Sequence, residues 1–357
     1  MRTGREWQLV RRPEGTPCDD DVRLVEVDVP DPVPGEVLVR NTVMSVEPYM
    51  RGRMSDRPSY AEPYTLGAPM TGHAVGEVIA SKAEGIPVGT RVRHERGWRE
   101  YALVPADEAE SVGGEGGIVP SAYLGALGLT GMTAYVGLLG IGRCRPGDTV
   151  LVSAAAGAVG ATAGQIAKAM GCTVIGSAGS PEKVRFLTEE LGFDAAFSHR
   201  APSLRDALGE ALERAGVGVG RGFTGGDGDR GGGGVDVYFD NVGGAQLEAA
   251  IRVMRTFGRI VLCGAISVYN ATEPVPGPRN LLLMIWRRLR MEGFLLGDHE
   301  DRRADFERDM TRWLRDGTVR NVETTASGGI DAAWPAFLAL LRGDNIGKTI
   351  VRLDEAG

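Results

Sequence analysis

Short segments that alternate apolar and polar side chains occupy the first third of the chain. The alternation covers residues 22–29, 36–40, 76–80 and 89–93, with prolines and glycines between the segments. A period of two that is interrupted by Pro and Gly predicts short β-strands with one buried face. The first part of the chain is therefore expected to be a small, irregular β domain.

From Leu124 onward, apolar runs alternate with stretches of helical composition. The expected strands are 149–153, 173–176, 194–197, 235–240 and 258–264, and the expected helices are 161–170, 181–191, 203–215 and 245–255. Strands that alternate with helices of about 10 to 15 residues are typical of βαβ units and a parallel sheet. The pattern therefore predicts an α/β domain with a doubly wound parallel sheet.

The end of the chain returns to other patterns. An amphipathic helix is expected at 303–316, a second helix at 330–341 and a strand at 348–353. We expect these elements to rejoin the β domain, which then comprises residues 1–125 and 300–357, with the α/β domain at 126–299. Residues 216–234 are so rich in glycine that we expect a flexible surface insertion there.

Composition narrows the class of protein. The chain has 357 residues, 43% of them hydrophobic, and 40 Lys and Arg stand against 47 Asp and Glu, a net charge of −7. These values indicate a soluble globular protein of two domains, and the acidic balance is atypical of a nucleic-acid-binding protein. The sequence shows no apolar run of about 18 residues that could span a membrane, and the first residues lack the apolar stretch of a secretory signal. We therefore expect no membrane and no nucleic acid as partners, and a cytoplasmic location.

The four cysteines are not arranged as a zinc site. Cys18, Cys144, Cys172 and Cys263 are far apart in the sequence and form no C-x-x-C pair. A structural zinc lobe usually takes its ligands from closely spaced pairs. The cysteines are therefore interpreted as buried or strand residues.

A loop of small residues follows the first strand of the α/β domain. Residues 154–160 read Ala-Ala-Ala-Gly-Ala-Val-Gly and lead directly into the expected helix. A tight turn between a strand and a helix N-terminus presents backbone N–H groups to a pyrophosphate. Residues Gly157, Ala158, Val159 and Gly160 are therefore predicted to bind a dinucleotide, with a plain packing turn as the alternative.

The end of the next strand indicates which dinucleotide. No carboxylate that would bond a ribose 2′-OH follows this strand before Glu182, and Lys183 comes next. His199 and Arg200 follow the third strand, near the same ribose. These residues favour NADP(H), although Lys183 could also be a solvated helix-start lysine.

Several segments together resemble the zinc-independent branch of the medium-chain dehydrogenase/reductases. The branch meant is the prostaglandin/leukotriene reductase-like group of NADPH-dependent double-bond reductases, which act on alkenals and enones. The segments are 45–51 (Ser-Val-Glu-Pro-Tyr-Met-Arg), 131–135, 154–160, 238–244 (Tyr-Phe-Asp-Asn-Val-Gly-Gly), 263–270 (Cys-Gly-Ala-Ile-Ser-Val-Tyr-Asn) and 343–349. The resemblance covers nearly the whole chain. It implies a GroES-like, β-rich catalytic domain and a Rossmann domain that binds NADP(H).

The resemblance also implies that no zinc takes part. The zinc-dependent branch carries Gly-His-Glu where this chain has Gly72-His73-Ala74, and no cysteine lies between Cys18 and Cys144. His73 is therefore expected to be structural. The chemistry left without zinc is hydride transfer to a substrate that is activated only by hydrogen bonds.

An α,β-unsaturated ketone or aldehyde suits such a site. Hydride is expected to attack the β-carbon, and a donor aimed at the carbonyl oxygen stabilises the enolate. By resemblance, Tyr269 and the nicotinamide ribose supply that donor, although a plain loop tyrosine is the alternative reading of Tyr269. Tyr49, Tyr64 and Trp286 are expected to line the substrate pocket.

The resemblance also assigns a set of residues to the cofactor, and a homodimer formed through the Rossmann domains. A strand after Gly293 is expected at that dimer edge. The predicted cofactor residues are Met132, Thr133, Gly157, Ala158, Val159, Gly160, Gly179, Ser180, Lys183, His199, Asn241, Cys263, Gly264, Ala265, Ile266, Ser267, Tyr269, Phe294, Leu295, Leu296 and Asn345.

Three other functions remain open at this point. A quinone reductase uses the same two domains without zinc. A biosynthetic tailoring enzyme could reduce or cyclise an intermediate on the same scaffold. A non-catalytic, crystallin-like NADPH-binding protein is the alternative of another class, and it would be expected to lack a donor such as Tyr269.

Overall fold

A computed structural model describes residues 2–113, 117–218 and 233–353, and the chain divides into two compact units. Unit 1 comprises Met1–Gly128 and Glu323–Gly357, and unit 2 comprises Leu129–Val322. The expected insertion at 216–234 falls mostly on residues 219–232, which lie outside the described residues.

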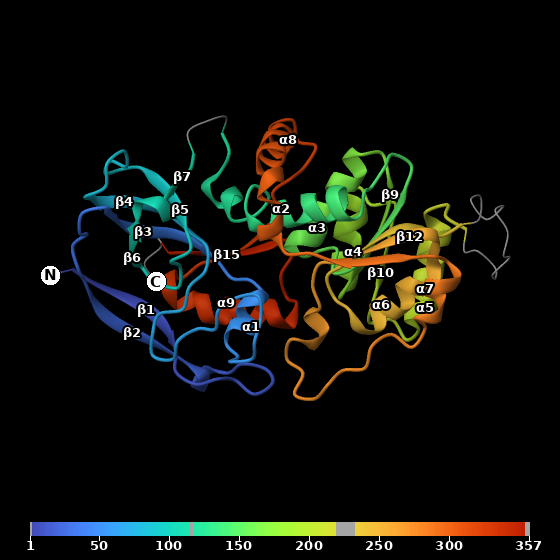
Figure 1. Cartoon of the computed structure of the whole chain (residues 1–357), viewed down its shortest axis with the longest axis horizontal. Helices are drawn as coiled ribbons and strands as arrows, with labels where there is room; N and C mark the ends of the chain where they lie inside the picture. Colours follow the sequence, from blue (N-terminus) through green and yellow to red (C-terminus); the bar gives the residue numbers. More distant parts are fainter. Residues whose placement is uncertain (1, 114–116, 219–232, 354–357) are drawn as a thin grey trace. The chain divides into compact units, whose positions relative to one another are not determined.

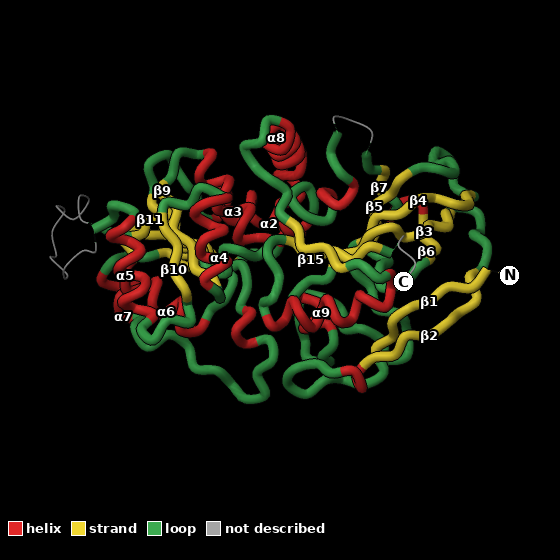
Figure 2. The backbone as a smooth tube through the Cα atoms, turned by 180° about the vertical axis from the view of Figure 1, so that it is seen from behind, coloured by secondary structure: helices red, strands yellow, loops and turns green. Residues whose placement is uncertain are grey.

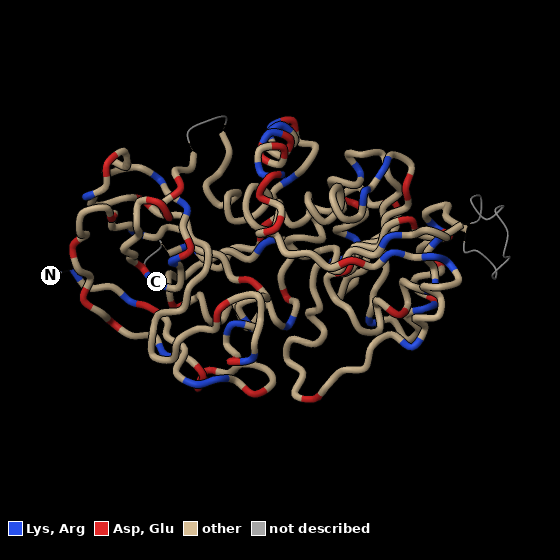
Figure 3. The backbone as a smooth tube through the Cα atoms, in the orientation of Figure 1, with Lys and Arg blue, Asp and Glu red and all other residues tan. Residues whose placement is uncertain are grey.

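The boundary after unit 2 differs from the expected position at 299/300. Helix α8 (Arg303–Arg315), along which Figure 3 shows charges of both signs, packs against unit 2. The rings of Phe306 and Trp313 lie 5.8 and 6.4 Å from the ring of Tyr135. Because its apolar face is buried there, residues 300–322 belong to unit 2.

Unit 2 is built on one parallel sheet of six strands (Figure 1). The strands lie in the order β10-β9-β8-β11-β12-β13, which is the strand order of a Rossmann domain. They are β8 (Thr149–Val152), β9 (Thr173–Ala178), β10 (Ala195–Ser198), β11 (Val235–Asp240), β12 (Met254–Leu262) and β13 (Arg290–Gly293). The predicted doubly wound fold is confirmed, but the edge strand β13 ends at Gly293 instead of following it.

Helices cover both faces of this sheet, as successive residues of β11 show. Tyr238 packs in a core with α5 (Leu204–Arg214), α6 (Gly244–Val253) and α7 (Leu282–Trp286), which lie together in Figure 2. The next residue, Phe239, lies so close to Gly137 that a Cβ there would come within 2.7 Å of its ring. Because strand side chains alternate between faces, a strand covered on both sides carries apolar residues on both, as Val237, Tyr238 and Phe239 do in β11. The other helical segments are α2 (Leu129–Tyr135), a π-helical turn (Val136–Ile141), α3 (Ala158–Ala169), α4 (Pro181–Arg185), a second π-helical turn (Phe186–Glu190), and 3-10 turns at Ile266–Val268 and Leu296–Arg302.

Unit 1 is β-rich, as predicted. One sheet has the order β14-β15-β3-β4-β5-β7, with β6 paired to β3, and β1 and β2 form a separate antiparallel pair. The strands are β1 (Arg2–Leu9), β2 (Val22–Val29), β3 (Glu36–Ser45), β4 (Ala74–Ser81), β5 (Arg91–His94), β6 (Tyr101–Pro105), β7 (Glu110–Ser111), β14 (Glu323–Ala326) and β15 (Lys348–Arg352).

A helix near the end of the chain contributes to the core of unit 1. Helix α9 (Ala333–Arg342) buries Trp334 and Phe337 in a core that also holds Met50 of the short helix α1 (Tyr49–Arg53) and Trp98. The remaining short turns of unit 1 are Asp19–Asp21, Ala106–Glu108, Pro120–Tyr123 and Gly329–Ala332. Among the described residues, no helix is long and apolar enough to cross a membrane.

Candidate active site

The turn after β8 is tight and leaves no room for a side chain at Gly160. Ala154 has a positive φ of 46°, and a Cβ at Gly160 would lie 2.4 Å from the Ala154 carbonyl oxygen. Gly157 caps α3, so the N–H groups at the start of this 12-residue helix have no partner within the helix. The predicted loop at Gly157 to Gly160 therefore offers a close backbone approach and the positive end of a helix dipole, which together fit a pyrophosphate.

Asp240, at the end of β11, organises the neighbouring loops. Its carboxylate is completely buried, and Oδ1 accepts hydrogen bonds from the Ser153 hydroxyl at 3.0 Å and the Tyr238 hydroxyl at 2.8 Å. The backbone N–H groups of Val242 and Gly243 donate to the same oxygen, each at 3.0 Å. One carboxylate therefore holds the ends of β8 and β11 and the turn before α6 in a single arrangement.

Sequence reasoning did not assign Asp240 to the site. Its position in the segment Tyr-Phe-Asp-Asn-Val-Gly-Gly was the available signal, because an acidic residue directly after Val-Tyr-Phe at the end of a buried strand must find donors. The neighbouring Asn241 was assigned, and its side-chain amide donates to the Ser153 carbonyl oxygen at 2.8 Å.

The loop after β12 joins the same assembly. Cys263 and Gly264 donate their N–H groups to the Asp240 carbonyl oxygen at 2.9 and 3.0 Å. The Ser267 hydroxyl donates to the Val242 carbonyl oxygen at 2.6 Å, so the loops after β11 and β12 support each other. Burial raises the pKa of the Cys263 thiol to about 12, with the Asp240 charge as the second cause, so this thiol stays protonated.

Tyr269 lies in this loop with its hydroxyl beside the backbone of Gly264 and Ala265. The Ala265 N–H donates to the hydroxyl oxygen at 3.5 Å, and a Cβ at Gly264 would lie 3.4 Å from it. Because this oxygen accepts a bond, its own proton stays available for donation. Burial raises the pKa of Tyr269, which keeps that proton in place at neutral pH.

Basic side chains gather where β9 and β10 end. A Cβ at Gly179 would lie 3.3 Å from His199 Cε1 and 3.7 Å from Arg200 Nε, so both side chains flank this glycine. Within the described residues, the buried His199 Nδ1 has no hydrogen-bond partner. Ser180 caps α4, and its Oγ accepts from the Lys183 N–H at 3.3 Å. Burial, and then the Arg200 charge, lower the pKa of His199.

This cluster fits a phosphate on a ribose better than a bare ribose. It offers a guanidinium and an imidazole at the end of a strand that carries no carboxylate. Arg200 was noted in the sequence but was not assigned to the site, and the structure brings it beside Gly179.

The other predicted site residues of unit 2 come from helices and from the end of β13. Met132 is buried in α2, and the Thr133 hydroxyl donates to the Leu129 carbonyl oxygen within the same helix at 2.7 Å. Trp286 ends α7, and Phe294, Leu295 and Leu296 follow β13 directly.

Three predicted residues lie in unit 1. Tyr49 begins α1, and burial, followed by the Glu47 charge, raises its pKa. The Asn345 amide donates to the Gly347 carbonyl oxygen at 2.7 Å. The Tyr64 side chain belongs to the core, and its hydroxyl donates to the Thr71 carbonyl oxygen at 2.6 Å. Its role in the substrate pocket stays a prediction.

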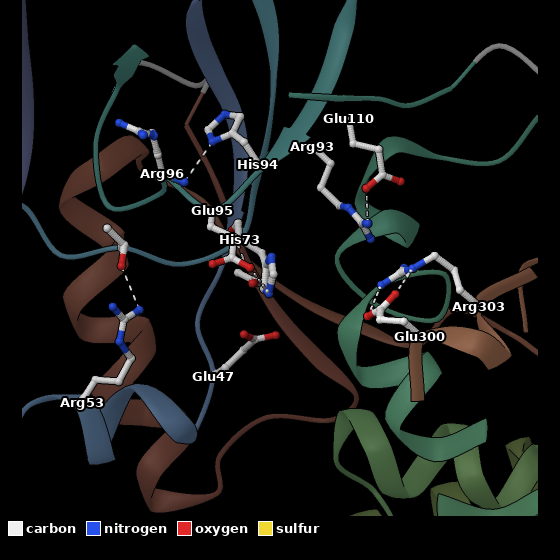
Figure 4. Close-up of polar contacts among 12 residues, drawn as sticks. Glu47, Arg53, His73, Arg93, His94, Glu95, Arg96, Glu110, Glu300 and Arg303 are labelled. Atoms are coloured by element: carbon white, nitrogen blue, oxygen red, sulfur yellow. Dashed lines mark hydrogen bonds and ion pairs between the residues drawn. The ribbon is translucent and has the colours of Figure 1, made fainter. Parts of the chain in front are cut away.

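Several ionisable side chains lie near His73, and each has at least one polar contact (Figure 4). His73 Nε2 lies 3.9 Å from Glu95 Oε1, and the nearby Glu47 forms a buried ion pair with Lys348. The buried His94 accepts the Arg96 N–H on Nδ1 at 3.0 Å, and burial lowers its pKa to about 3. In residues 2–113, 117–218 and 233–353, no group of three or more His, Cys, Asp or Glu side chains is arranged to hold a metal ion.

Comparison with known proteins adds to this geometry. Residues 5–112 match the family described as the N-terminal domain of oxidoreductase, and residues 158–315 match the family described as zinc-binding dehydrogenase. The chain is 39% identical over 354 residues to an NADPH-dependent curcumin reductase of Escherichia coli, covering 98% of this chain and 96% of the relative. It is 38% identical to a 2-alkenal reductase (NADP(+)-dependent) of Nicotiana tabacum, covering 94% of each. A solved structure of CurA in complex with NADPH from Vibrio vulnificus is 39% identical, with a TM-score of 0.88 and coverage of 98% of this chain and 99% of that one.

Proposed function

Because the chain belongs to the zinc-independent medium-chain dehydrogenase/reductases, in their alkenal/one reductase group, we propose that it reduces the carbon–carbon double bond of α,β-unsaturated ketones and aldehydes with NADPH. A 2-alkenal, the substrate that names one relative, is such an aldehyde. NADPH is the cofactor named for the curcumin reductase and for the solved relative.

The observation that carries the proposal is the Tyr269 hydroxyl, protonated and beside the loop that follows β12. When bound, NADPH supplies a hydride, and attack at the β-carbon of an enone moves negative charge onto the carbonyl oxygen. Tyr269 donates a hydrogen bond to that oxygen and stabilises the enolate. A donor held in place before the reaction costs little reorganisation in the transition state.

The surrounding residues hold the cofactor and the donor. The Gly157 to Gly160 turn binds the pyrophosphate with its backbone N–H groups, and Asn241 with residues 263–267 supports the nicotinamide end. Asp240 positions both loops through its hydrogen bonds to Ser153, Val242 and Gly243. His199, Arg200, Ser180 and Lys183 bind the 2′-phosphate and so favour NADPH over NADH.

A substrate panel tests the proposal. The full chain is given NADPH and trans-2-enals, enones and quinones, with and without a chelator, while absorbance at 340 nm is followed. We expect turnover of enals and enones that the chelator does not change. Turnover of quinones alone would favour a quinone reductase, absence of any turnover would favour a non-catalytic NADPH-binding protein, and loss on chelation would contradict a zinc-independent reaction.

The same proposal includes a homodimer formed through unit 2. Strand β13 is the last strand of the six-stranded sheet, and its Met291 side chain is exposed. Helix α7 also exposes two apolar side chains, Ile285 and Trp286. An unpaired strand edge with apolar neighbours suits pairing with a second copy of the chain. Sedimentation should give about twice 37.9 kDa, and Met291→Lys should shift the protein to a single chain. A monomeric native protein would contradict the dimer.

The cytoplasmic location stays a prediction.

A further inference from the structure

Two cysteines that are distant in the sequence meet in unit 2. The Sγ atoms of Cys144 and Cys172 lie 3.2 Å apart, and both residues are buried. Cys144 precedes β8, and Cys172 immediately precedes β9. Both thiols therefore lie at the amino-terminal ends of these strands, whereas the proposed reaction uses the loops at their carboxyl ends.

The backbone holds the two thiols side by side. Cys144 donates its N–H to the Leu138 carbonyl oxygen at 3.1 Å, and Cys172 donates to Ala167 at 3.0 Å. Between them, the Gly147 N–H donates to the Gly171 carbonyl oxygen at 3.1 Å. Because the two segments are tied to each other, the sulfur atoms meet without any large movement of the chain.

The two sulfur atoms are already close to the length of a disulfide bond. A disulfide bond is about 2.05 Å long, so the two sulfurs need to approach by about 1 Å, which small side-chain rotations can supply. The other two cysteines have no such partner in the described chain: Cys18 is exposed in unit 1, and Cys263 contributes to the loop after β12.

The two thiols are chemically unequal. The hydrogen bond between them lowers the pKa of the Cys172 thiol, against the opposing effects of burial and of the Asp148 charge, and it raises the pKa of Cys144. Since the thiolate is the nucleophile in oxidation, Cys172 is the sulfur that reacts first and Cys144 the one that resolves the product.

We propose that Cys144 and Cys172 form a redox site, which hydrogen peroxide converts into an intramolecular disulfide. In the first step the Cys172 sulfur attacks peroxide, the O–O bond breaks, and one water and a Cys172 sulfenic acid form. In the second step the Cys144 sulfur displaces the sulfenic oxygen, which leaves as a second water. Two thiols are oxidised and one peroxide is reduced to two waters. The disulfide links the two ends of a segment that contains β8 and α3.

The test uses the full-length reduced protein. After exposure to hydrogen peroxide, the protein is unfolded and alkylated, and its intact mass is measured. We expect the number of alkylated thiols to fall from the full four to two, and dithiothreitol to restore four. Trypsin cuts after Arg143, Lys168 and Lys183, so the disulfide should join peptides 144–168 and 169–183.

Three variants make the test specific. Cys144→Ser should accumulate a Cys172 sulfenic acid that dimedone traps, whereas Cys172→Ser should trap much less. Cys18→Ser should leave the disulfide unchanged. The proposal is overturned if peroxide oxidises Cys18 while peptides 144–168 and 169–183 stay unlinked, or if protein unfolded in guanidinium forms the same link equally fast.

Activity separates this site from the proposed function. Because the disulfide lies at the opposite ends of the strands from Tyr269, the oxidised protein should oxidise NADPH within about twofold of the reduced rate. Thiol counts and peptide masses report the disulfide even if every enal and enone fails as a substrate.

Discussion

The Tyr269 hydroxyl owes its chemical state to its surroundings, because burial keeps it protonated and the Ala265 N–H occupies its oxygen. Tyr269→Phe removes only that hydroxyl. We expect the turnover number with an enal to fall by on the order of 10² to 10³, while NADPH affinity changes by less than about twofold. Steady-state kinetics and fluorescence titration with NADPH measure the two quantities.

Tyr123→Phe provides the matched control for this variant. Tyr123 packs beside a small apolar cluster of unit 1 that includes Leu124, and it is not among the residues assigned to the reaction. Its substitution should leave turnover unchanged. Equal losses in both tyrosine variants, or no loss in Tyr269→Phe, would remove the proposed role of the Tyr269 hydroxyl.

His199 predicts a pH dependence of cofactor choice. Its pKa lies below the ordinary value in the free protein, mainly because of burial, so the imidazole is neutral at pH 8. A bound 2′-phosphate favours the protonated form. The complex therefore takes up a proton that the free protein does not hold, and NADPH affinity rises as pH falls.

The measurement compares NADPH with NADH at pH 8 and at pH 6.5. The ratio of the two dissociation constants should favour NADPH more strongly at pH 6.5, by about threefold or more. NADH, which lacks the phosphate, is the matched control, and His199→Gln should abolish the change in the ratio. A ratio that is independent of pH in the native protein would mean that Arg200 and Lys183 act without His199.

Among the elements, those with repeating patterns were predicted well. Five strands of unit 2 were located because apolar residues dominate them, whereas β13 reads Arg-Met-Glu-Gly, has no apolar run and was expected after Gly293. The turn at Gly157 to Gly160 was located because its strand and helix frame it. Strand β1 was not recognised, because residues 2–6 read Arg-Thr-Gly-Arg-Glu and only Trp7 and Leu9 are large apolar residues in residues 2–9.

Residues with partners far along the chain were harder to predict. The Asp240 carboxylate accepts the hydroxyl of Ser153, 87 residues earlier in the chain, and α8 packs Phe306 against Tyr135. A single sequence shows that these side chains are polar or apolar, but it does not show which groups they meet. The same is true of Cys144 and Cys172, which looked like isolated small residues.

Two elements of unit 1 are joined by the buried pair between Glu47, after β3, and Lys348 at the start of β15. Removal of either partner leaves a buried charge without compensation. Glu47→Gln and Lys348→Met should each lower the free energy of unfolding by about 3–5 kcal/mol, and the double variant should lose much less than the sum. Urea unfolding measures all four proteins.

An exposed pair on α8 is the matched control for this cycle. Asp305 and Arg308 form an ion pair at the surface, where coupling is worth about 0–1 kcal/mol. Coupling of that small size for Glu47 and Lys348 would contradict their role in joining β3 to β15.

Over the whole molecule, unit 1 is built from two parts of the chain that are separated in the sequence by unit 2. Unit 2 is inserted between β7 and β14 of unit 1, and the last segment returns to add β15 beside β3 and α9 to the core. Unit 1 therefore depends on residues 323–352, which supply β14, α9 and β15. The main residues assigned to the cofactor and to the reaction lie in one unit: the turn for the pyrophosphate, the basic cluster and Tyr269 all belong to unit 2.

The most direct test of the proposed reaction follows a labelled hydride into the product. The full chain is incubated with a trans-2-alkenal and NADPH carrying deuterium at C4 of the nicotinamide, with each C4 epimer used in turn. The product is then examined by NMR. Hydride transfer to the β-carbon predicts a saturated aldehyde with deuterium at C3 from one of the two epimers. An allylic alcohol with deuterium at C1 would contradict the proposed function, because it would show that the carbonyl group is reduced instead of the double bond.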